Sequence, residues 1–264
     1  MSLIIIAIIG PYIAPYDHDE RIRDENGEIV RAEPPSMDHP LGTTTDGFDV
    51  LSNLIIGTQP TIVAGFLGGA ILITIGLSIG LVAGYYGNTI DNILMRFTDL
   101  MYGVPVIPFA IVLVALLGVS YFTSILIIGM ILWRGSARVI RSQTLQIKER
   151  PFIQSAKAVG ASNTRIIVSH ILPNVAPMAI LFFAIGTGYT ILIMAGLAFL
   201  GVTDPFVPSW GIIVRNAYDS GLAGQMWWWS VPPGLLIALT VLALFMIGRS
   251  LEADEENNAS VGAP

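Results

Sequence analysis

Long stretches without charged side chains divide this chain. Asp, Glu, Lys and Arg are absent from residues 50–90, 100–133, 166–203 and 220–248. A helix rises about 1.5 Å per residue, and the hydrocarbon core of a bilayer is about 30 Å thick, so about 20 apolar residues cross it. Each stretch is therefore long enough for at least one membrane-spanning helix.

The second stretch predicts a helical hairpin, because it is interrupted at residues 118–121 and ends in a polar helix face. Arg134, Arg138 and Arg141 follow one another at i, i+4 and i+7 and so lie on one stripe. We expect these long side chains to reach the headgroups at the membrane boundary. The predicted spans are residues 61–85, 104–118, 122–141, 169–199 and 231–249.

A sixth span is expected at the N-terminus. Residues 2–14 are apolar, but as a helix they would rise only about 20 Å. No Lys or Arg precedes them, as one would in a signal peptide. We interpret them as a spanning helix that has lost its beginning. The predicted fold class is thus an all-α integral membrane protein with six transmembrane helices, the first short or truncated.

Composition supports the membrane and excludes several kinds of chemistry. The chain has 53% apolar and only 12% charged residues, where soluble domains have about 25% charged residues. It has no cysteine, which excludes disulfides and thiolate sites, and no Gly-x-x-x-x-Gly-Lys-Ser/Thr phosphate loop. Paired acids, a Ser/Lys pair or a histidine cluster at membrane depth are absent as well. We predict no enzyme activity, no cofactor and no metal site.

Charge placement predicts the orientation. Residues 134–165 hold seven of the thirteen Lys and Arg against the single acid Glu149, whereas residues 15–50 hold three Arg against ten acids. By the positive-inside rule the first segment is cytoplasmic. Six spans then place both termini on the cytoplasmic side of a plasma or inner membrane. The predicted divisions are residues 1–60, with the partial first helix and acidic outer loop, a permeation core at 61–251, and a disordered acidic tail at 252–264.

Small residues and aromatic residues mark the spans. Glycines recur every four residues at Gly76, Gly80 and Gly84, which favours close helix contact over a pore-lining role. Tyr85 and Tyr86, like the tryptophans at 227–229, lie at predicted boundaries and indicate an aromatic belt.

Two charged features remain near the predicted inner boundary. Asp91, Arg96 and Asp99 fall in the short connection after the second span, where we expect a locally paired interfacial helix. His170 stands at the start of a span, where a helix-end or loop contact is a better interpretation than a proton relay.

The basic segment also carries a surface of small residues, which would let another body approach the backbone closely. Gly160 predicts a bend, and Ser162 or Asn163 a cap for a second helical turn. Lys157 and Arg165 flank the surface and could meet acids on a partner. The small residues are Ser155, Ala156, Ala158, Gly160 and Ala161.

Here the sequence resembles a known family. Gln154-Ser-Ala, three residues, Gly160, nine residues and His170-Ile-Leu-Pro173 resemble the EAA loop of permease subunits of binding-protein-dependent ABC importers, in the peptide/nickel branch. The family pattern begins Glu-Ala-Ala, so Gln154 and Ser155 depart from it. Segments 41–57 and 200–211 resemble the same family.

The resemblance implies a permease subunit of an ATP-driven importer, which forms with a second permease the pathway for peptides or similar small solutes. It also implies ATPase subunits on the inner side, and a solute-binding protein received by the outer loops 15–50 and 201–229. The implied coupling loop, between the fourth and fifth spans, comprises Gln154, Ser155, Ala156, Lys157, Gly160, Ala161 and Pro173.

The alternative is a stand-alone channel or secondary carrier whose basic loop only satisfies the positive-inside rule. Ion-coupled carriers commonly keep a charge near the midplane of the membrane, and the predicted spans hold none.

Overall fold

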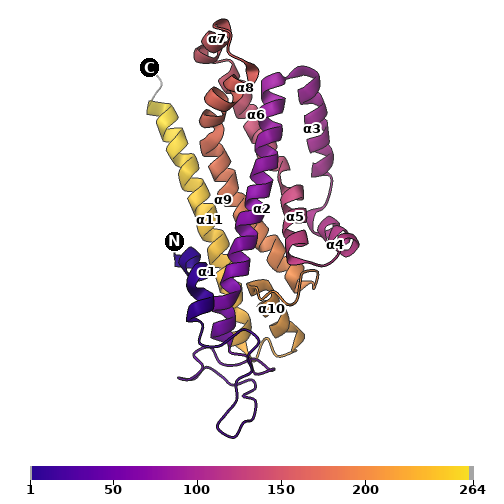
Figure 1. Cartoon of the computed structure of the whole chain (residues 1–264), viewed down its shortest axis with the longest axis vertical. Helices are drawn as coiled ribbons and strands as arrows, with labels where there is room; N and C mark the ends of the chain where they lie inside the picture. The colour runs from indigo at the N-terminus through magenta and orange to yellow at the C-terminus, as the bar shows by residue number, and fades with distance from the viewer. Residues whose placement is uncertain (1, 262–264) are drawn as a thin grey trace. The chain divides into compact units, whose positions relative to one another are not determined.

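The computed structural model describes the backbone of residues 2–261 and the side chains of residues 3–250. Its elements are helical, and β pairing in the described residues is confined to three isolated bridges within residues 21–49. The helices (Figure 1) are α1 (Ser2–Ile13), α2 (Val50–Tyr86), α3 (Asn88–Tyr102), α4 (Val106–Leu117), α5 (Tyr121–Leu132), α6 (Arg134–Lys148), α7 (Pro151–Ala158), α8 (Asn163–Ile166), the π-helical turn η1 (Ile167–Ile171), α9 (Leu172–Phe199), α10 (Trp210–Asp219) and α11 (Trp227–Val261).

Three helical segments are long and apolar enough to cross a membrane: Val50–Tyr86, Asn163–Phe199 and Trp227–Ser250. Two bent pairs, α3 with α4 and α5 with α6, raise the number to five if each pair is one span. At the N-terminus, α1 is a short apolar helix of 12 residues. The all-α membrane fold is confirmed, and the count of six spans stays a prediction.

The two arms of the predicted hairpin are helices α4 and α5, but they differ from the predicted spans. Gly118 has a φ of +99°, which glycine adopts freely, and it forms the turn between α4 and α5. The first arm, α4, has only 12 residues and would rise about 18 Å, too little to cross a bilayer alone. It is bent by 91° from α3, because Pro105 disfavours helical geometry in the residue before it. The second arm is bent by 41° between α5 and α6.

The chain divides into two compact units, each made of three separate stretches. Unit 1 comprises Met1–Phe66, Ile111–Ile125 and Tyr189–Leu242, and unit 2 comprises Leu67–Ala110, Leu126–Gly188 and Ala243–Pro264. Helices α2, α4, α5, α9 and α11 contribute residues to both units. The predicted boundaries at residues 60 and 251 stay a prediction. Of the predicted disordered tail, residues 252–261 continue α11 and residues 262–264 lie outside the described residues.

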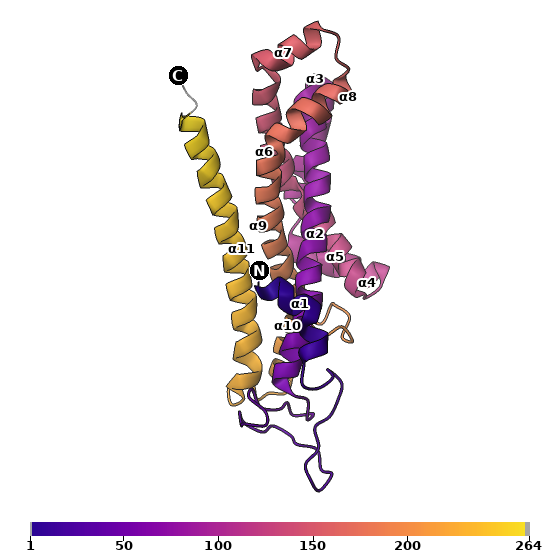
Figure 2. The same cartoon turned by 60° about the vertical axis from the view of Figure 1, so that its left-hand side comes forward.

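Unit 1 is organised around a buried tryptophan on α10. The Trp210 side chain is fully buried, and its indole N–H donates to the carbonyl of Leu54 at 3.2 Å. Its backbone N–H donates to the hydroxyl of Thr61 at 3.1 Å. In the same unit α1 lies beside the first turns of α2 (Figure 2), where Gly10 approaches the carbonyl of Ile55. Trp229 is buried and Trp227 is about half exposed, so only part of the Trp227–Trp229 run suits an aromatic belt.

Unit 2 is held together by close contact between α2 and α6. A Cβ added to Gly76 would lie 2.0 Å from the hydroxyl oxygen of Ser136, and one added to Gly80 would lie 2.8 Å from the carbonyl of Ala137. At Gly84 the added atom would lie 2.6 Å from the Cβ of Thr144. The expected close helix contact along this glycine stripe is therefore confirmed.

The arginines of α6 bind α3, and the expectation that they reach the headgroups stays a prediction. Arg141 forms a two-point ion pair with Asp91, with Nη2 at 2.6 Å from Oδ2. Arg138 Nη2 lies 2.6 Å from Asp99 Oδ1, and Arg134 donates to the carbonyl of Met101 at 2.7 Å. Carboxylates on a neighbouring helix accept charge-assisted hydrogen bonds from these arginines, and the planar guanidinium group can donate two of them to one carboxylate. Asp91 and Asp99 thus pair with α6, and the expectation that α3 is paired locally is wrong for these two residues.

Candidate functional site

The basic segment folds into a short helix, α7, with defined ends. Arg150 is extended and Pro151 occupies the first helical position, where its missing N–H costs nothing. At the other end Gly160 has a φ of +82°. Its N–H donates to the carbonyl of Lys157, and the N–H of Ala161 donates to the carbonyl of Ala156, both at 3.0 Å. This is a Schellman ending, so the predicted bend at Gly160 is confirmed.

The chain then returns through α8 and the π-helical turn η1 (Figure 2). Ser162 caps α8 by accepting from the N–H of Arg165 at 3.4 Å, as predicted. In η1 the N–H of Leu172 donates to the carbonyl of Ile167, five residues back. Pro173 follows at once, and it has no N–H with which to continue regular pairing. The His170-Ile-Leu-Pro173 motif thus marks the passage from a π-helical turn into α9.

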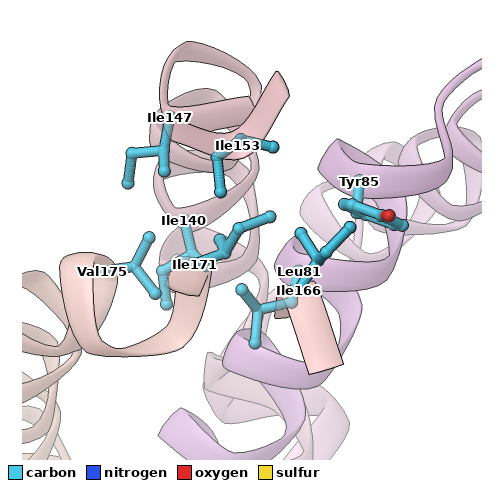
Figure 3. Close-up of a cluster of buried hydrophobic side chains, with 8 residues drawn as sticks. All are labelled: Leu81, Tyr85, Ile140, Ile147, Ile153, Ile166, Ile171 and Val175. Carbon is cyan, nitrogen blue, oxygen red and sulfur yellow. The ribbon is translucent and has the colours of Figure 1, made fainter. Parts of the chain in front are cut away.

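A cluster of buried apolar side chains holds these turns against α2 and α6. Figure 3 shows its members facing one another from α2, α6, α7, α8, η1 and α9. Ile153 of α7 and Ile166 of α8 are fully buried, and burying such a side chain from water contributes about 1.5–3 kcal/mol. The loop is therefore a packed part of unit 2. The members are Leu81, Tyr85, Ile140, Ile147, Ile153, Ile166, Ile171 and Val175.

Beside α7 the surface is hollowed by a cavity of about 440 Å³. At its edge Val159, the C-cap residue of α7, is 85% exposed. Only cationic and neutral side chains line the hollow, and Glu149 is the one acid within residues 134–165. The lining residues are Ser155, Ala156, Val159, Gly160, Ala161, Arg165 and His170. The surface can receive an apolar, acidic protrusion of another protein.

Four of the seven predicted coupling residues, Ser155, Ala156, Gly160 and Ala161, line this hollow. The other three lie apart from it. The side-chain amide of Gln154 donates to the carbonyl of Lys148 at 3.4 Å, which the glutamate of the family pattern, as an acceptor, would not do when ionised. The Lys157 ammonium lies 5.9 Å from the centre of the Tyr85 ring, and Pro173 is the second residue of α9.

The sequence did not predict that a residue of α2 contacts this site. Tyr85 is buried, and its hydroxyl donates to the side-chain carbonyl of Asn163 at 2.8 Å. An aromatic pair at the end of an apolar run is typical of an aromatic belt at the membrane boundary. The sequence therefore did not indicate that Tyr85 bonds to a residue 78 positions away. His170 makes the expected loop contact, with its ring 6.5 Å from that of Phe152.

Comparisons with known proteins place this arrangement in a family. Residues 76–253 match the binding-protein-dependent transport system inner membrane component family. The glutathione transport system permease protein of Pectobacterium atrosepticum is 33% identical over 95% of this chain and 82% of its own length. The dipeptide transport system permease protein of Bacillus subtilis is 33% identical over 96% of this chain and 77% of its own length.

The chain belongs to this family of transport permeases. A structure of the MetNI methionine ABC transporter in an inward-facing conformation matches 75% of the permease and 95% of the compared chain, with a TM-score of 0.56 and 20% identity, and so shares its fold. The protein is thus a permease subunit of an ABC importer, which decides against the stand-alone channel or carrier. Within the described residues no group of three potential metal ligands occurs.

Proposed function

We propose that this permease forms, with a second homologous permease, the pathway of an importer for peptides or similar small solutes. The named substrates of its relatives, glutathione and dipeptides, support this solute class. ATP hydrolysis then occurs on separate ATPase subunits, which agrees with the absence of a phosphate loop from the sequence.

The hollow beside α7 is the observation that carries the coupling role. It joins small side chains, an exposed Val159 and the cationic side chain of Arg165 in one concave surface. The coupling loop, with Gln154, Ser155, Ala156, Lys157, Gly160, Ala161 and Pro173, is the docking site of an ATPase subunit. The buried cluster fixes this loop to α2 and α6, so movement of the ATPase is passed to helices that cross the membrane.

The orientation follows from the same assignment. The coupling loop and both termini are cytoplasmic, and the acidic segment 15–50 faces outward, where with residues 201–229 it receives the solute-binding protein. The acidic segment is ordered by its own contacts. For example, Asp49 accepts from the backbone and the hydroxyl of Ser52, both at 2.7 Å, and its other oxygen lies 3.2 Å from Nδ1 of His39.

Val159→Asp tests the docking role. Gly160 is a poor probe, because any side chain at a φ of +82° strains the backbone before docking is affected. Val159 has ordinary backbone angles and is 85% exposed. An unmatched charge at a protein contact costs several kcal/mol, so we expect at least a tenfold lower recovery of the ATPase subunits encoded with this permease, roughly 1.4 kcal/mol.

Met37→Asp is the matched control. It makes the same chemical change at a fully exposed residue of the outer segment, and we expect ATPase recovery to stay at the level of the unmodified complex. Equal recovery of the ATPase with Val159→Asp and with Met37→Asp would overturn the docking role.

A further inference from the structure

Tyr85 lies where four elements of unit 2 meet. It belongs to the last turn of α2, and its ring is 5% exposed. Its hydroxyl donates to Asn163, the first residue of α8. The Lys148 ammonium, at the end of α6, lies 6.0 Å from the ring centre, and the Lys157 ammonium, on α7, lies 5.9 Å from it. Both distances are at the outer limit for attraction between a cation and an aromatic face.

The two ends of Tyr85 have separate roles. The ring is part of the apolar cluster (Figure 3) and would be replaced well by another aromatic ring. The hydroxyl makes one directed bond, to a residue in the return arm of the coupling loop. Apolar packing permits sliding, whereas a hydrogen bond fixes one distance and one direction. The hydroxyl therefore sets the position of the loop on α2, beyond the packing that the ring supplies.

We propose that Tyr85 is a positioning residue, whose bond to Asn163 makes the coupling loop and the end of α2 move as one body. This inference rests on the proposed docking of an ATPase at the loop. It adds that the movement of the coupling loop reaches α2 directly through the bond from Tyr85 to Asn163, and not only by way of α6 and α9. The glycine stripe packs α2 closely against α6, so a displacement at Tyr85 is passed along a tightly packed pair of helices.

Spin-label distances test this proposal cleanly, because the native chain contains no cysteine. Leu67→Cys on α2 and Thr164→Cys on α8 place labels at exposed residues of unit 2. The distance is measured by pulsed electron paramagnetic resonance in lipid nanodiscs. It is measured first for the permease alone, then for the complex with its ATPase, without nucleotide and with ATP under conditions that block hydrolysis.

With Tyr85 present, we expect one narrow distance distribution that ATP leaves unchanged. With Tyr85→Phe, which keeps the ring and loses the hydroxyl, we expect a second population in the permease alone that grows when ATP is bound. Losing one hydrogen bond shifts such an equilibrium by about threefold to tenfold. Asn163→Leu should have the same effect, and Asn163→Asp, which keeps an acceptor, should restore the single distribution.

Amounts of complex and the unfolding temperature separate positioning from mere stability. We expect Tyr85→Phe to leave both close to those of the unmodified protein. An unchanged distribution in Tyr85→Phe would overturn the proposal, and so would an ATP-dependent distance when Tyr85 is present. Failure of the docking role gives a different result, since the ATPase would then be recovered equally with Val159→Asp, while the measurement on the permease alone still tests the bond.

Discussion

The glycines of this permease differ in what surrounds them, and that difference decides what a methyl group would do. At Gly80 an added Cβ would lie 2.8 Å from the carbonyl of Ala137 and from the Cβ of Ile140. At Gly234 in α11 nothing lies within 4 Å. The first glycine is required by a neighbouring helix, and the second is not.

Gly80→Ala should therefore destabilise the protein by about 1–3 kcal/mol, the usual cost of overpacking. Gly234→Ala is the control, and it should be neutral or stabilising by up to about 1 kcal/mol, because alanine favours helix more than glycine does. Thermal unfolding of the detergent-solubilised permease measures both. A similar loss for the two variants would show that α2 and α6 do not approach as closely as described.

Residue patterns with local causes were predictable. The four-residue glycine spacing predicted the contact of α2, and the Gly160 bend and Ser162 cap followed from the chemistry of those residues. The bond between Tyr85 and Asn163 could not be predicted, because it joins residues 78 positions apart. A tyrosine and an asparagine can each bond to many kinds of residue, so neither one indicates its partner.

Among the elements, α3 and α6 are joined by ion pairs between acids on one helix and arginines on the other. Asp91 is 13% exposed in its pair with Arg141, whereas Asp99 is 63% exposed in its pair with Arg138. The two pairs have the same chemistry and join the same two helices. Their contributions should differ because water screens the exposed pair and reaches the other much less.

Asp91→Asn should cost about 1–3 kcal/mol of stability, since it leaves a half-buried guanidinium without its charged partner. Asp99→Asn should cost less than about 1 kcal/mol. Denaturation of the two variants, with added salt as a second variable, provides the comparison. If Asp99→Asn proves as costly as Asp91→Asn, the exposure of the pairs does not control their strength.

Element positions were predictable where charge-free runs are long. The spans at α2, α9 and α11 and the turn at Gly118 agree with the pattern of apolar residues. The bend between α3 and α4 has a visible cause in Pro105. The 41° bend between α5 and α6 did not follow from the pattern, because an apolar run does not show where a helix changes direction. The arginine stripe of α6 was visible in the sequence, but its acidic partners on α3 lie 39 and 50 residues away.

For the whole molecule, the orientation in the membrane has a direct test. A single cysteine in place of the fully exposed Met37 should react with a membrane-impermeant maleimide in intact cells. A cysteine in place of Val159 should react only after the membrane is opened. The chain has no native cysteine, so labelling has no background. The reverse pattern would place the coupling loop outside and contradict the positive-inside assignment.

The membrane class and the family were predictable at this scale, because charge is low along most of the chain and residues 154–173 resemble the EAA loop of the family. The division into two compact units was not predictable, since each unit is assembled from three separate stretches.

The central claim is that this permease moves solute only when a separate ATPase drives it through the loop beside α7. Uptake of a radiolabelled dipeptide into proteoliposomes tests it most directly, with the complete complex compared with this permease alone. We predict uptake that requires ATP and all subunits and that is lost in Val159→Asp. Uptake by this chain alone, without ATP, would contradict the account.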